Sequence, residues 1–281
     1  MDCNMKRLFF KILSKIYVCV ILIILRFYKI KLVLFKIIKG IKTPIIHVYT
    51  VCWNEEKFLP FFIKHYGSFC DKIIVYDNES TDSTLNILAK NQKVSVITYK
   101  TGNKINDSEY QRIKNTAWKH SRGKADYVIV CDTDELLYDK NDNIKNTLQM
   151  SRNTIFHPEG YEMISEYFPS YDKPLREQCK GVPSKYYCKK IIFDPHCIVN
   201  INYYPGCHEA DPRGYVKTGT SEFLLLHFKR IGVEYIINRY HTFKERLSKQ
   251  NIENEMGMHY FMTEQEITDE FNRMFAAAKP V

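Results

Sequence analysis

The sequence predicts an α/β protein built on a mostly parallel sheet that is flanked by helices. Between residues 45 and 136, short apolar runs typical of buried strands alternate with helical segments. Three of these runs are followed directly by polar clusters, as expected where parallel strands end at the same edge of a sheet. The β-α-β order with short connections favours parallel pairing and right-handed crossovers.

The first part of the chain gives the clearest pattern. A strand is predicted at 45–52, followed by a helix that begins at Asn54, a good N-cap residue with two acids after it, and ends at Gly67. The elements predicted next are strands at 72–76 and 94–99, helices at 83–90 and 109–121, and a strand at 127–131.

After residue 150 the pattern is looser, with frequent aromatic residues, Pro and Gly. This favours an irregular C-terminal α+β lobe packed against the sheet edge. It contains short strands at 162–168, 189–193 and 222–228 and helices at 233–250 and 264–277. The predicted organisation is a basic hydrophobic segment at 1–43, an α/β half at 44–150, a second half at 151–232 and C-terminal helices at 233–281.

The positive charge of the chain is concentrated at its beginning. Residues 1–43 hold ten Lys or Arg and one acid, Asp2, so they account for the whole net charge of +9. The remainder is balanced, and charge therefore gives no indication of a nucleic-acid surface.

The same segment is also strongly apolar. Its longest uncharged stretch, 16–25, has ten residues, fewer than the roughly 20 of a spanning helix. On a helical wheel the cations gather on one face, which predicts an amphipathic helix lying on an anionic membrane. A signal-anchor at 8–25, with Lys11 and Lys15 snorkelling, is the alternative. Both predict membrane association, with the rest of the chain cytoplasmic, or lumenal if the segment is a signal-anchor.

The nine cysteines form no CxxC pair. Cys179, Cys188, Cys197 and Cys207 are nine or ten residues apart, which leaves a zinc site or two disulfides open, but this spacing matches no common ligand pattern. Reduced structural thiols in a cytosolic setting are favoured.

The candidate site begins with the acids Asp132 and Asp134, which follow the predicted strand 127–131. In extended backbone, residues two apart point the same way. Two carboxylates on one side form a hard oxygen site for Mg²⁺ or Mn²⁺, of the kind that holds a diphosphate. A solvated acidic turn is the simpler alternative. The argument for a ligand site therefore depends on the further polar clusters at 54–55 and 77–82.

A nucleotide-diphosphate ligand explains all three clusters together. Asp77 can accept hydrogen bonds from a base or ribose, and the acid pair can hold a cation that neutralises the two phosphates. Such neutralisation helps a nucleoside diphosphate to leave.

Three segments carry a specific resemblance: CWNEEKFLPFFIKHY (52–66), KIIVYDNESTDST (72–84) and VIVCDTDELL (128–137). They resemble glycosyltransferases of the GT-A fold, in the family 2-like group that includes family 92. The resemblance covers about 45–140 strongly and 141–232 weakly. It implies an inverting transfer of a sugar from a nucleotide-sugar donor, and the basic segment adds a glycan or glycolipid as the expected acceptor.

The resemblance also implies roles for individual residues. Asp132, Thr133 and Asp134 would bind the metal and the diphosphate, and Glu135 would support the metal shell or orient the donor sugar. The nucleotide pocket would be lined by Asn54, Glu55, Asp77, Asn78 and Asp82. From their charge alone, the possible phosphate contacts are Arg112, Lys185, Lys189 and Lys190.

Two histidines are further candidates. GT-A enzymes often supply a metal-binding His from a late strand, and His227 follows such an apolar run. His208 lies in a G-x-H motif and is a candidate metal ligand or phosphate contact. Imidazole suits Mn²⁺, while a hydrogen-bonded core His and a surface turn are the respective alternatives.

An inverting transfer needs a base that takes the proton of the acceptor hydroxyl. The Asp motif that family 2 members often use is missing here. Glu209 is preferred for its place beside His208, and Asp211 and Glu135 complete the predicted catalytic set. Glu166 and Glu222 are further possibilities.

Two other functions fit part of the pattern. A haloacid-dehalogenase-like phosphatase would use Asp132 as nucleophile, but Glu135 and two leucines follow where that pattern usually has small residues and Thr or Val. Covalent trapping of a phosphoryl group on Asp132 would favour it. A non-catalytic, membrane-bound sugar-nucleotide-binding scaffold would be favoured if no base exists.

Overall fold

The computed structural model describes residues 42–281. The predicted membrane segment therefore lies almost wholly outside the described residues, and its membrane association stays a prediction. Each helix among residues 42–281 is too short or too polar to span a bilayer.

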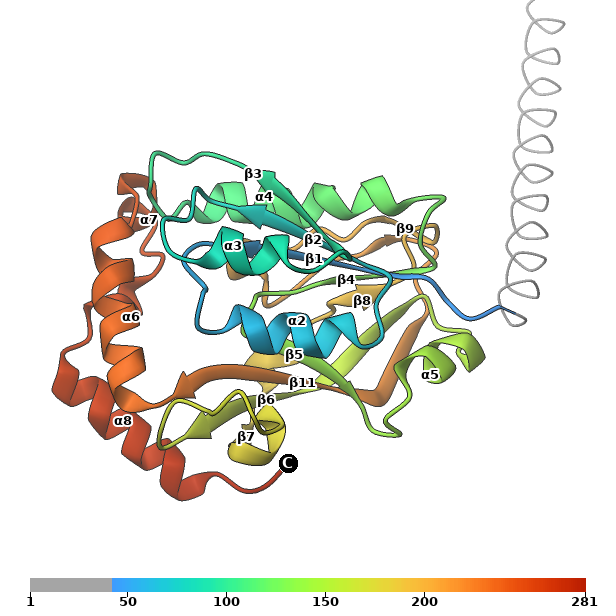
Figure 1. Ribbon diagram of the computed structural model, residues 1–281. Helices are drawn as coiled ribbons and strands as arrows, with labels where there is room; N and C mark the ends of the chain where they lie inside the picture. Colours follow the sequence, from blue (N-terminus) through green and yellow to red (C-terminus); the bar gives the residue numbers. More distant parts are fainter. Residues whose placement is uncertain (1–41) are drawn as a thin grey trace, which may run out of the picture. The chain divides into compact units, whose positions relative to one another are not determined.

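One sheet of nine strands organises the described chain (Figure 1). Its strand order is β3-β2-β1-β4-β8-β6-β11-β5, and β7 pairs with β6 outside this path. The strands are β1 (Ile46–Cys52), β2 (Lys72–Asp77), β3 (Val94–Thr98), β4 (Tyr127–Val130), β5 (Glu135–Asp139), β6 (Ile155–Ser165), β7 (Lys180–Pro183), β8 (Ile192–Phe193) and β11 (Thr218–Ile231). The short strands β9 (Ile198–Asn200) and β10 (Arg213–Gly214) form a second, two-stranded sheet.

The predicted α/β class is confirmed, and the four strands of the first part are parallel as predicted. β1 pairs in parallel with β2 and β4, and β2 pairs in parallel with β3. The later strands continue this sheet: β6 and β11 are parallel to each other, whereas β5, β7 and β8 run antiparallel to their neighbours.

The inner strands β1 and β4 are apolar and buried on both faces, whereas the edge strand β3 is partly exposed. Ile46 and Val48 of β1 belong to a core cluster that includes Phe62 of α2, whereas Tyr49 belongs to a cluster with Trp118. The helices are α2 (Leu59–Gly67), α3 (Thr84–Ala89), α4 (Asp107–Thr116), α5 (Ile144–Met150), α6 (Val233–Arg246), α7 (Lys249–Glu253) and α8 (Glu264–Ala277).

The prediction that the first helix begins at Asn54 was wrong. Asn54 has a left-handed backbone (φ 49°), and α2 begins at Leu59 after a turn in which Phe58 N and Leu59 N donate to Glu55 O. The reason is tertiary, because the Asn54 side chain bonds to the loop after β2 and does not cap a helix.

The bounds of several other elements also differ from the predicted ones. The helix predicted at 109–121 is α4 followed by a 3₁₀ helix at Ala117–Ser121, and the helix predicted at 233–250 is divided into α6 and α7. The strand predicted at 162–168 ends at Ser165 and begins earlier, at Ile155. α8 has the predicted bounds, since a capping box of Thr263 and Glu266 fixes its start.

Candidate functional site

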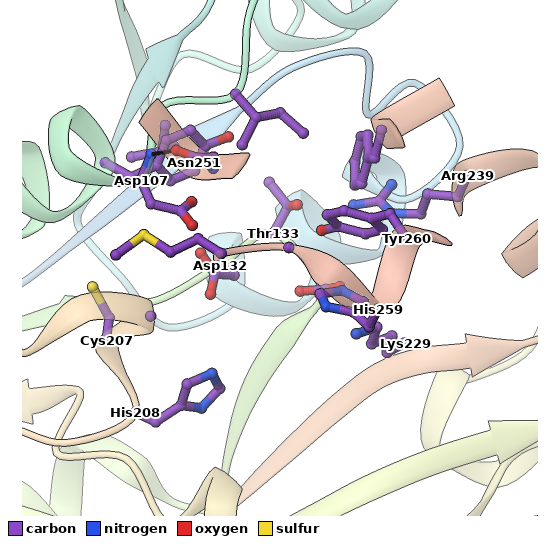
Figure 2. Close-up of a pocket in the computed structure, with 18 of the residues that line it drawn as sticks. Asp107, Asp132, Thr133, Cys207, His208, Lys229, Arg239, Asn251, His259 and Tyr260 are labelled. Carbon is purple, nitrogen blue, oxygen red and sulfur yellow. Dashed lines mark hydrogen bonds between the residues drawn. The ribbon is translucent and has the colours of Figure 1, made fainter. Parts of the chain in front are cut away.

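The acidic loop follows β4 at its carboxyl end and leads into β5. Asp132, Thr133 and Asp134 line a cavity of about 570 Å³, and Figure 2 shows Asp132 and Thr133 on its wall. Thr133 and Asp134 form a turn, so the expected extended backbone is not what brings the two acids together. They share the cavity because the turn reverses the chain at the sheet edge.

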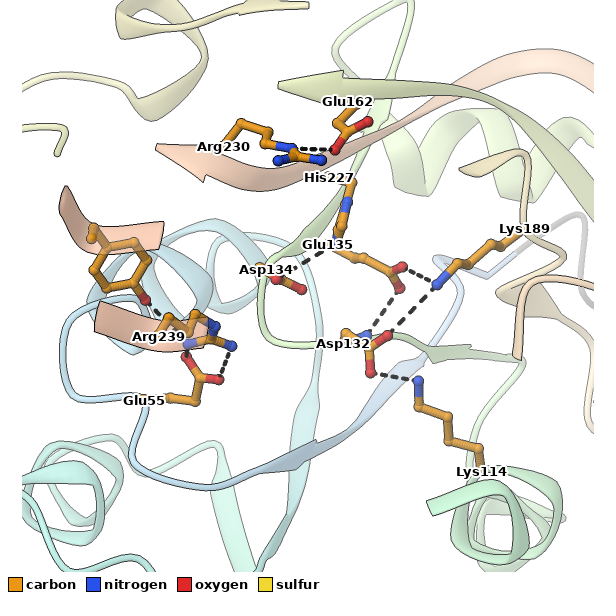
Figure 3. Close-up of polar contacts among 11 residues, drawn as sticks. Glu55, Lys114, Asp132, Asp134, Glu135, Glu162, Lys189, His227, Arg230 and Arg239 are labelled. Atoms are coloured by element: carbon orange, nitrogen blue, oxygen red, sulfur yellow. Dashed lines mark hydrogen bonds and ion pairs between the residues drawn. The ribbon is translucent and has the colours of Figure 1, made fainter. Parts of the chain in front are cut away.

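Two buried lysines surround Asp132 (Figure 3). Lys114 Nζ, from α4, lies 2.5 Å from Asp132 Oδ1, and Lys189 Nζ lies 3.6 Å from Oδ2. Lys189 Nζ is also 2.5 Å from Glu135 Oε1, while Glu135 Oε2 accepts a hydrogen bond from Asp132 N. Burial raises the pKa of Asp132, but the two lysines outweigh it and bring the pKa to about 2. Asp132 is therefore an anion at neutral pH.

Asp134 and His227 form the second polar pair of the cavity. His227 Nε2 lies 3.5 Å from Asp134 Oδ2. The register of β11 against β5 places His227 opposite Glu135, and this pairing brings the late histidine to the acidic loop. Burial raises the pKa of Asp134, but His227 and then Arg239 lower it more, so its pKa lies well below the ordinary value.

The Asp134–His227 pair fits a divalent cation as a two-residue site. Two cis ligands that each bind an ion at about 2.1 Å lie roughly 3 Å apart, close to the separation found here. Within residues 42–281, no group of three or more His, Cys, Asp and Glu side chains could hold an ion. Water or phosphate oxygens would have to complete the shell, as is usual for Mg²⁺. His227 Nδ1 is buried without a hydrogen-bond partner in the described chain, so the usual orienting contact of a metal-bound His is missing.

Glu55 is held by Arg239 of α6. The guanidinium reaches both carboxylate oxygens, with Nη2–Oε1 at 2.5 Å and Nη1–Oε2 at 3.0 Å, and Nη1 also donates to Tyr235 Oη. Burial raises the pKa of Glu55 even though Arg239 opposes it. Glu55 and Arg239 both line the cavity, so this pair connects the loop after β1 to the C-terminal helices.

Arg246 and Trp53 form another part of the cavity wall. The Arg246 guanidinium lies 3.3 Å from the Trp53 ring centroid, and its Nη2 donates to Asn78 Oδ1. The segment 246–260 is fastened to the loop before α4 because Ile105 N donates to Arg246 O. This segment therefore encloses the cavity on the side of α4.

Lys229 is a cavity-lining cation of a different kind. In the described chain it has no ion pair or hydrogen bond, and its ammonium lies 5.5 Å from the Tyr240 ring centroid. Burial, followed by the charge of Arg230, lowers the pKa of Lys229 to about 8. It is the cavity cation best able to take a new anionic partner.

Several predicted nucleotide contacts are bonded to one another and do not line the cavity. Asn54 donates to Thr81 Oγ1 and accepts from Thr81 N. Asp82 accepts from the backbone N–H groups of Glu56 and Thr84. These bonds join the loop after β1 to the loop after β2, so both residues shape the site from behind its wall.

Asp77 and Asn78 lie in the same layer. Asp77 is fully buried and accepts from Ser80 N. Asn78 Oδ1 accepts from Thr101 Oγ1 and from Arg246 Nη2. Neither lines the cavity, so a direct contact of Asp77 with a base or ribose finds no support in its position.

The remaining residues predicted to bind phosphate or to act as the base do not line the cavity either, with the exception of Lys189 and His208. Arg112 forms a two-point ion pair with Glu109 on α4. Glu209 is exposed, and Asp211 pairs with Arg213 at 2.7 Å. Buried Glu135 lies behind the cavity, held by Lys189. The other acids considered as bases, Glu166 and Glu222, are likewise absent from the lining.

His208 does line the cavity, as Figure 2 shows. Its Nδ1 lies 3.2 Å from Tyr186 O, and its ring stacks on the Tyr186 ring at a centroid distance of 3.6 Å. Burial, followed by the charge of Lys189, lowers the pKa of His208 to about 3. The imidazole is therefore neutral at physiological pH.

Sequence reasoning missed Lys114, Arg239 and Arg246. A signal for Lys114 existed, because it falls in the buried stripe of α4 beside Ile113 and three residues before Ala117. A lysine inside an apolar stripe indicates a buried charge with a partner. No comparable local signal marks the two arginines, which reach the cavity only through the packing of α6.

The cysteines of the described chain are all free thiols, which agrees with the structural role predicted for them. Cys131 is fully buried beside Tyr66, and burial raises its pKa well above the ordinary value.

Comparison with known proteins gives one informative match. Residues 47–145 match the model of glycosyl transferase family 2, which confirms the predicted resemblance for that part of the chain. A grouping with family 92 is not confirmed and stays a prediction. No curated protein sequence matches the chain significantly.

Likeness to solved structures is weak. The 4-diphosphocytidyl-2C-methyl-D-erythritol synthase from Anaerococcus prevotii DSM 20548 is 12% identical, with a TM-score of 0.33 over 56% of this chain and 73% of that one. A second crystal structure of a 4-diphosphocytidyl-2C-methyl-D-erythritol synthase is 8% identical, with a TM-score of 0.32 over 54% and 75%. These likenesses support no conclusion about function.

Proposed function

We propose that this protein is a metal-dependent glycosyltransferase that moves a sugar from a nucleotide-diphosphate sugar to a hydroxyl group of a glycan or glycolipid. The observation that carries the proposal is one cavity that brings together Asp132, Asp134 and His227 at the edge of a sheet that contains the family 2 match. Acids, an imidazole and buried cations side by side suit a diphosphate and its counterion.

The cations of the cavity are suited to bind the donor diphosphate. Lys114 and Lys189 line the cavity, and Asp132 and Glu135 already compensate most of their charge. Lys229 has no anionic partner of its own among the described residues and offers a further ammonium. Together they would stabilise the charge that develops on the leaving diphosphate.

Asp134 and His227 are the residues that would hold the divalent cation, with Asp132 beside them. The ion, when bound, would supply Lewis-acid neutralisation of the diphosphate. The role of Asp132 is then mainly electrostatic, because its two oxygens are directed at lysines.

The end of the cavity near α4 suits the nucleoside. Trp53 and the guanidinium of Arg246, which lies over the Trp53 ring and bonds to Asn78, form a flat wall at this end. The indole Nε1 of Trp53 is buried without a partner in the described chain. Behind this end, the Asn54–Thr81 and Glu56–Asp82 hydrogen bonds join the loops after β1 and β2.

A direct displacement at the anomeric carbon would invert its configuration. The lipid or glycan nature of the acceptor rests on the basic segment 1–43 together with the family match, and membrane attachment is part of this proposal. Flotation of the full chain with vesicles of anionic lipid tests it, and equal recovery with neutral vesicles would contradict an electrostatic attachment.

The donor assignment is tested by titrating the full chain with UDP, GDP and CDP by calorimetry, with and without Mn²⁺. We expect one nucleotide to bind tightly only with Mn²⁺, and Asp134→Asn to weaken that binding at least tenfold. Asp269→Asn, on the exposed side of α8, is the matched control and should bind normally. If no nucleotide binds under either condition, the proposal is wrong.

The phosphatase alternative requires Asp132 as a nucleophile. The family match and the pairing of both Asp132 oxygens with lysines favour the transferase. Incubation with a phosphoryl donor followed by mass spectrometry of the intact protein separates the two, since only the phosphatase leaves a phosphoryl group on Asp132.

A further inference from the structure

The proposed reaction needs a group that takes the proton of the acceptor hydroxyl, and three of the five carboxylates that line the cavity are already paired. Glu55 and Asp132 are ion-paired, and Asp134 is paired with His227. Asp107 lies next to Asn251 at the α4 end of the cavity, and Figure 2 shows it well away from His208. An exposed carboxylate, Glu255, completes the acids of the lining.

The hydrogen bonding of His208 fixes its tautomer. A backbone carbonyl can only accept, so the contact between Nδ1 and Tyr186 O places the single proton of the neutral ring on Nδ1. Nε2 then carries the lone pair. No hydrogen bond occupies Nε2 in the described chain, and this nitrogen is available to an incoming O–H group.

The ring is also fixed in direction. Tyr186 stacks on one face of His208, and the Tyr187 ring lies edge-on at 5.7 Å between centroids. Gly206 and Cys207 both have left-handed backbone (φ 77° and 56°), which turns the chain just before His208. Left-handed backbone is unfavourable for a residue with a side chain such as Cys207, so the surrounding packing holds this turn in place.

Gly206 leaves the Nε2 edge of the ring open. A Cβ on residue 206 would lie 3.1 Å from Cδ2 and 3.7 Å from Nε2 of His208. A glycine at this position therefore uncovers the side of the imidazole that carries the lone pair.

From this geometry we propose that His208 is the general base of the transfer. This inference rests on the proposed function. The acceptor oxygen forms a bond to the anomeric carbon of the donor while the bond from that carbon to the diphosphate oxygen breaks. The electron pair of the broken bond leaves with the nucleoside diphosphate, and the hydroxyl proton moves to Nε2 of His208. The imidazolium then loses this proton to water after the products leave.

The charges around His208 are consistent with this role. Lys189 and His227 lower its pKa and Asp132 raises it, so without a donor the ring is a weak base. A bound diphosphate adds negative charge to the same part of the cavity and raises the pKa towards the operating pH, where general bases work best.

The test compares full-length wild type with His208→Ala and His208→Gln. The assay follows release of nucleoside diphosphate from a panel of UDP-, GDP- and CDP-sugars, with water or added glycans as acceptor. We expect both variants to lose about 10²–10⁴-fold in turnover and to bind nucleoside diphosphate and Mn²⁺ within about threefold of wild type. Added imidazole should restore part of the activity of His208→Ala and none of the activity of His208→Gln, whose side chain fills the space. His157→Gln, an exposed substitution on β6, is the control.

Each other outcome has a clear meaning. If wild type releases no nucleotide from any sugar donor, the proposed function fails and this inference fails with it. If wild type is active and His208→Ala keeps nearly full turnover, only the base assignment is overturned. If His208→Ala loses Mn²⁺ affinity together with activity and imidazole does not rescue it, Nε2 is a metal ligand and the base assignment is again wrong.

Discussion

Most cations at this cavity are held in charged pairs, whereas Lys229 has neither a hydrogen bond nor an ion pair in the described chain. Lys114, Lys189 and Arg239 each contact a carboxylate, so their charges are largely compensated before any ligand binds. Burying an ammonium without a partner is costly, and an anionic ligand would recover that cost. Lys229 is therefore the residue whose replacement should separate ligand binding from folding.

We expect Lys229→Met to bind nucleoside diphosphate about five- to tenfold more weakly than wild type, because one charge-assisted contact of about 1–1.5 kcal/mol is lost. The free energy of unfolding should stay equal or rise, since a half-buried, unpaired charge is removed. Calorimetry and urea unfolding measure the two effects. Lys249→Met, at a highly exposed lysine, is the control, and equal affinity in both variants would show that Lys229 does not contact the diphosphate.

Pairs of elements are joined by a few buried polar contacts. The ion pair of Glu55 and Arg239 fastens α6 to the loop after β1. Tyr66 Oη, in α2, donates to Glu135 O and accepts from Leu137 N, so it bridges two backbone groups of β5. These contacts hold the helices against the acidic loop, so stability and site geometry are coupled.

The Glu55–Arg239 pair should show strong coupling. Arg239→Met alone leaves a buried carboxylate without its partner and should destabilise the fold by about 3–5 kcal/mol. Adding Glu55→Gln should recover a large part of that loss, because the unpaired charge is gone. Urea unfolding of the two single variants and the double variant measures the coupling. Additive effects would mean that the pair is not formed in solution.

The contact of α2 with β5 also predicts a pH dependence of stability. His65 Nε2 donates to Leu137 O, and burial lowers the pKa of His65 to about 4. Above pH 6.5 the ring is neutral in both the folded and the unfolded chain. As the pH falls from 6.5 towards 4, the unfolded chain binds a proton that the folded chain does not, so up to about 3 kcal/mol of stability is lost.

We expect His65→Gln, which can still donate to Leu137 O, to lose less stability than wild type between pH 7 and pH 4.5. Urea unfolding at both pH values measures the difference. His120→Gln, at an exposed histidine, is the control and should follow wild type. An unchanged pH dependence in His65→Gln would rule out this histidine as a source of acid lability.

At the scale of the whole molecule, the family 2 match ends at residue 145, but later residues contribute both to the sheet and to the cavity. β5 lies at the end of the sheet, and its neighbour there is β11, more than 75 residues later in the chain. Lys189, His227 and Arg239 likewise reach the cavity from the second half. The matched segment is therefore only part of one folding unit.

We accordingly expect a chain of residues 44–281 to unfold in one cooperative transition and a chain of residues 44–150 to lack stable tertiary structure, because β5 would lose its neighbour β11. Near-ultraviolet circular dichroism and limited proteolysis distinguish the two. A cooperative transition in the shorter chain would show that the first half folds without β11.

The sequence by itself determined the four parallel strands β1 to β4 and the edge at which polar residues gather, but it predicted neither β5 nor α5. These features depend on local periodicity. The apolar runs are the strands β1, β2 and β4, and the polar residues follow at the end of each strand. It also named Glu55, Asp132, Thr133, Asp134, His208 and His227, all of which line the cavity. It did not show that Asn54 and Asp82 join the loops after β1 and β2 behind the wall, or that Asp77 accepts from Ser80 within its own loop.

Only the tertiary structure decided which side chains meet. The register of β11 on β5 brings His227 to Asp134, the packing of α6 brings Arg239 to Glu55, and the turn at 206–207 directs His208 into the cavity. Strand register and helix packing are set by contacts far apart in the chain, and such contacts leave no periodic mark in the sequence around the residues that they join.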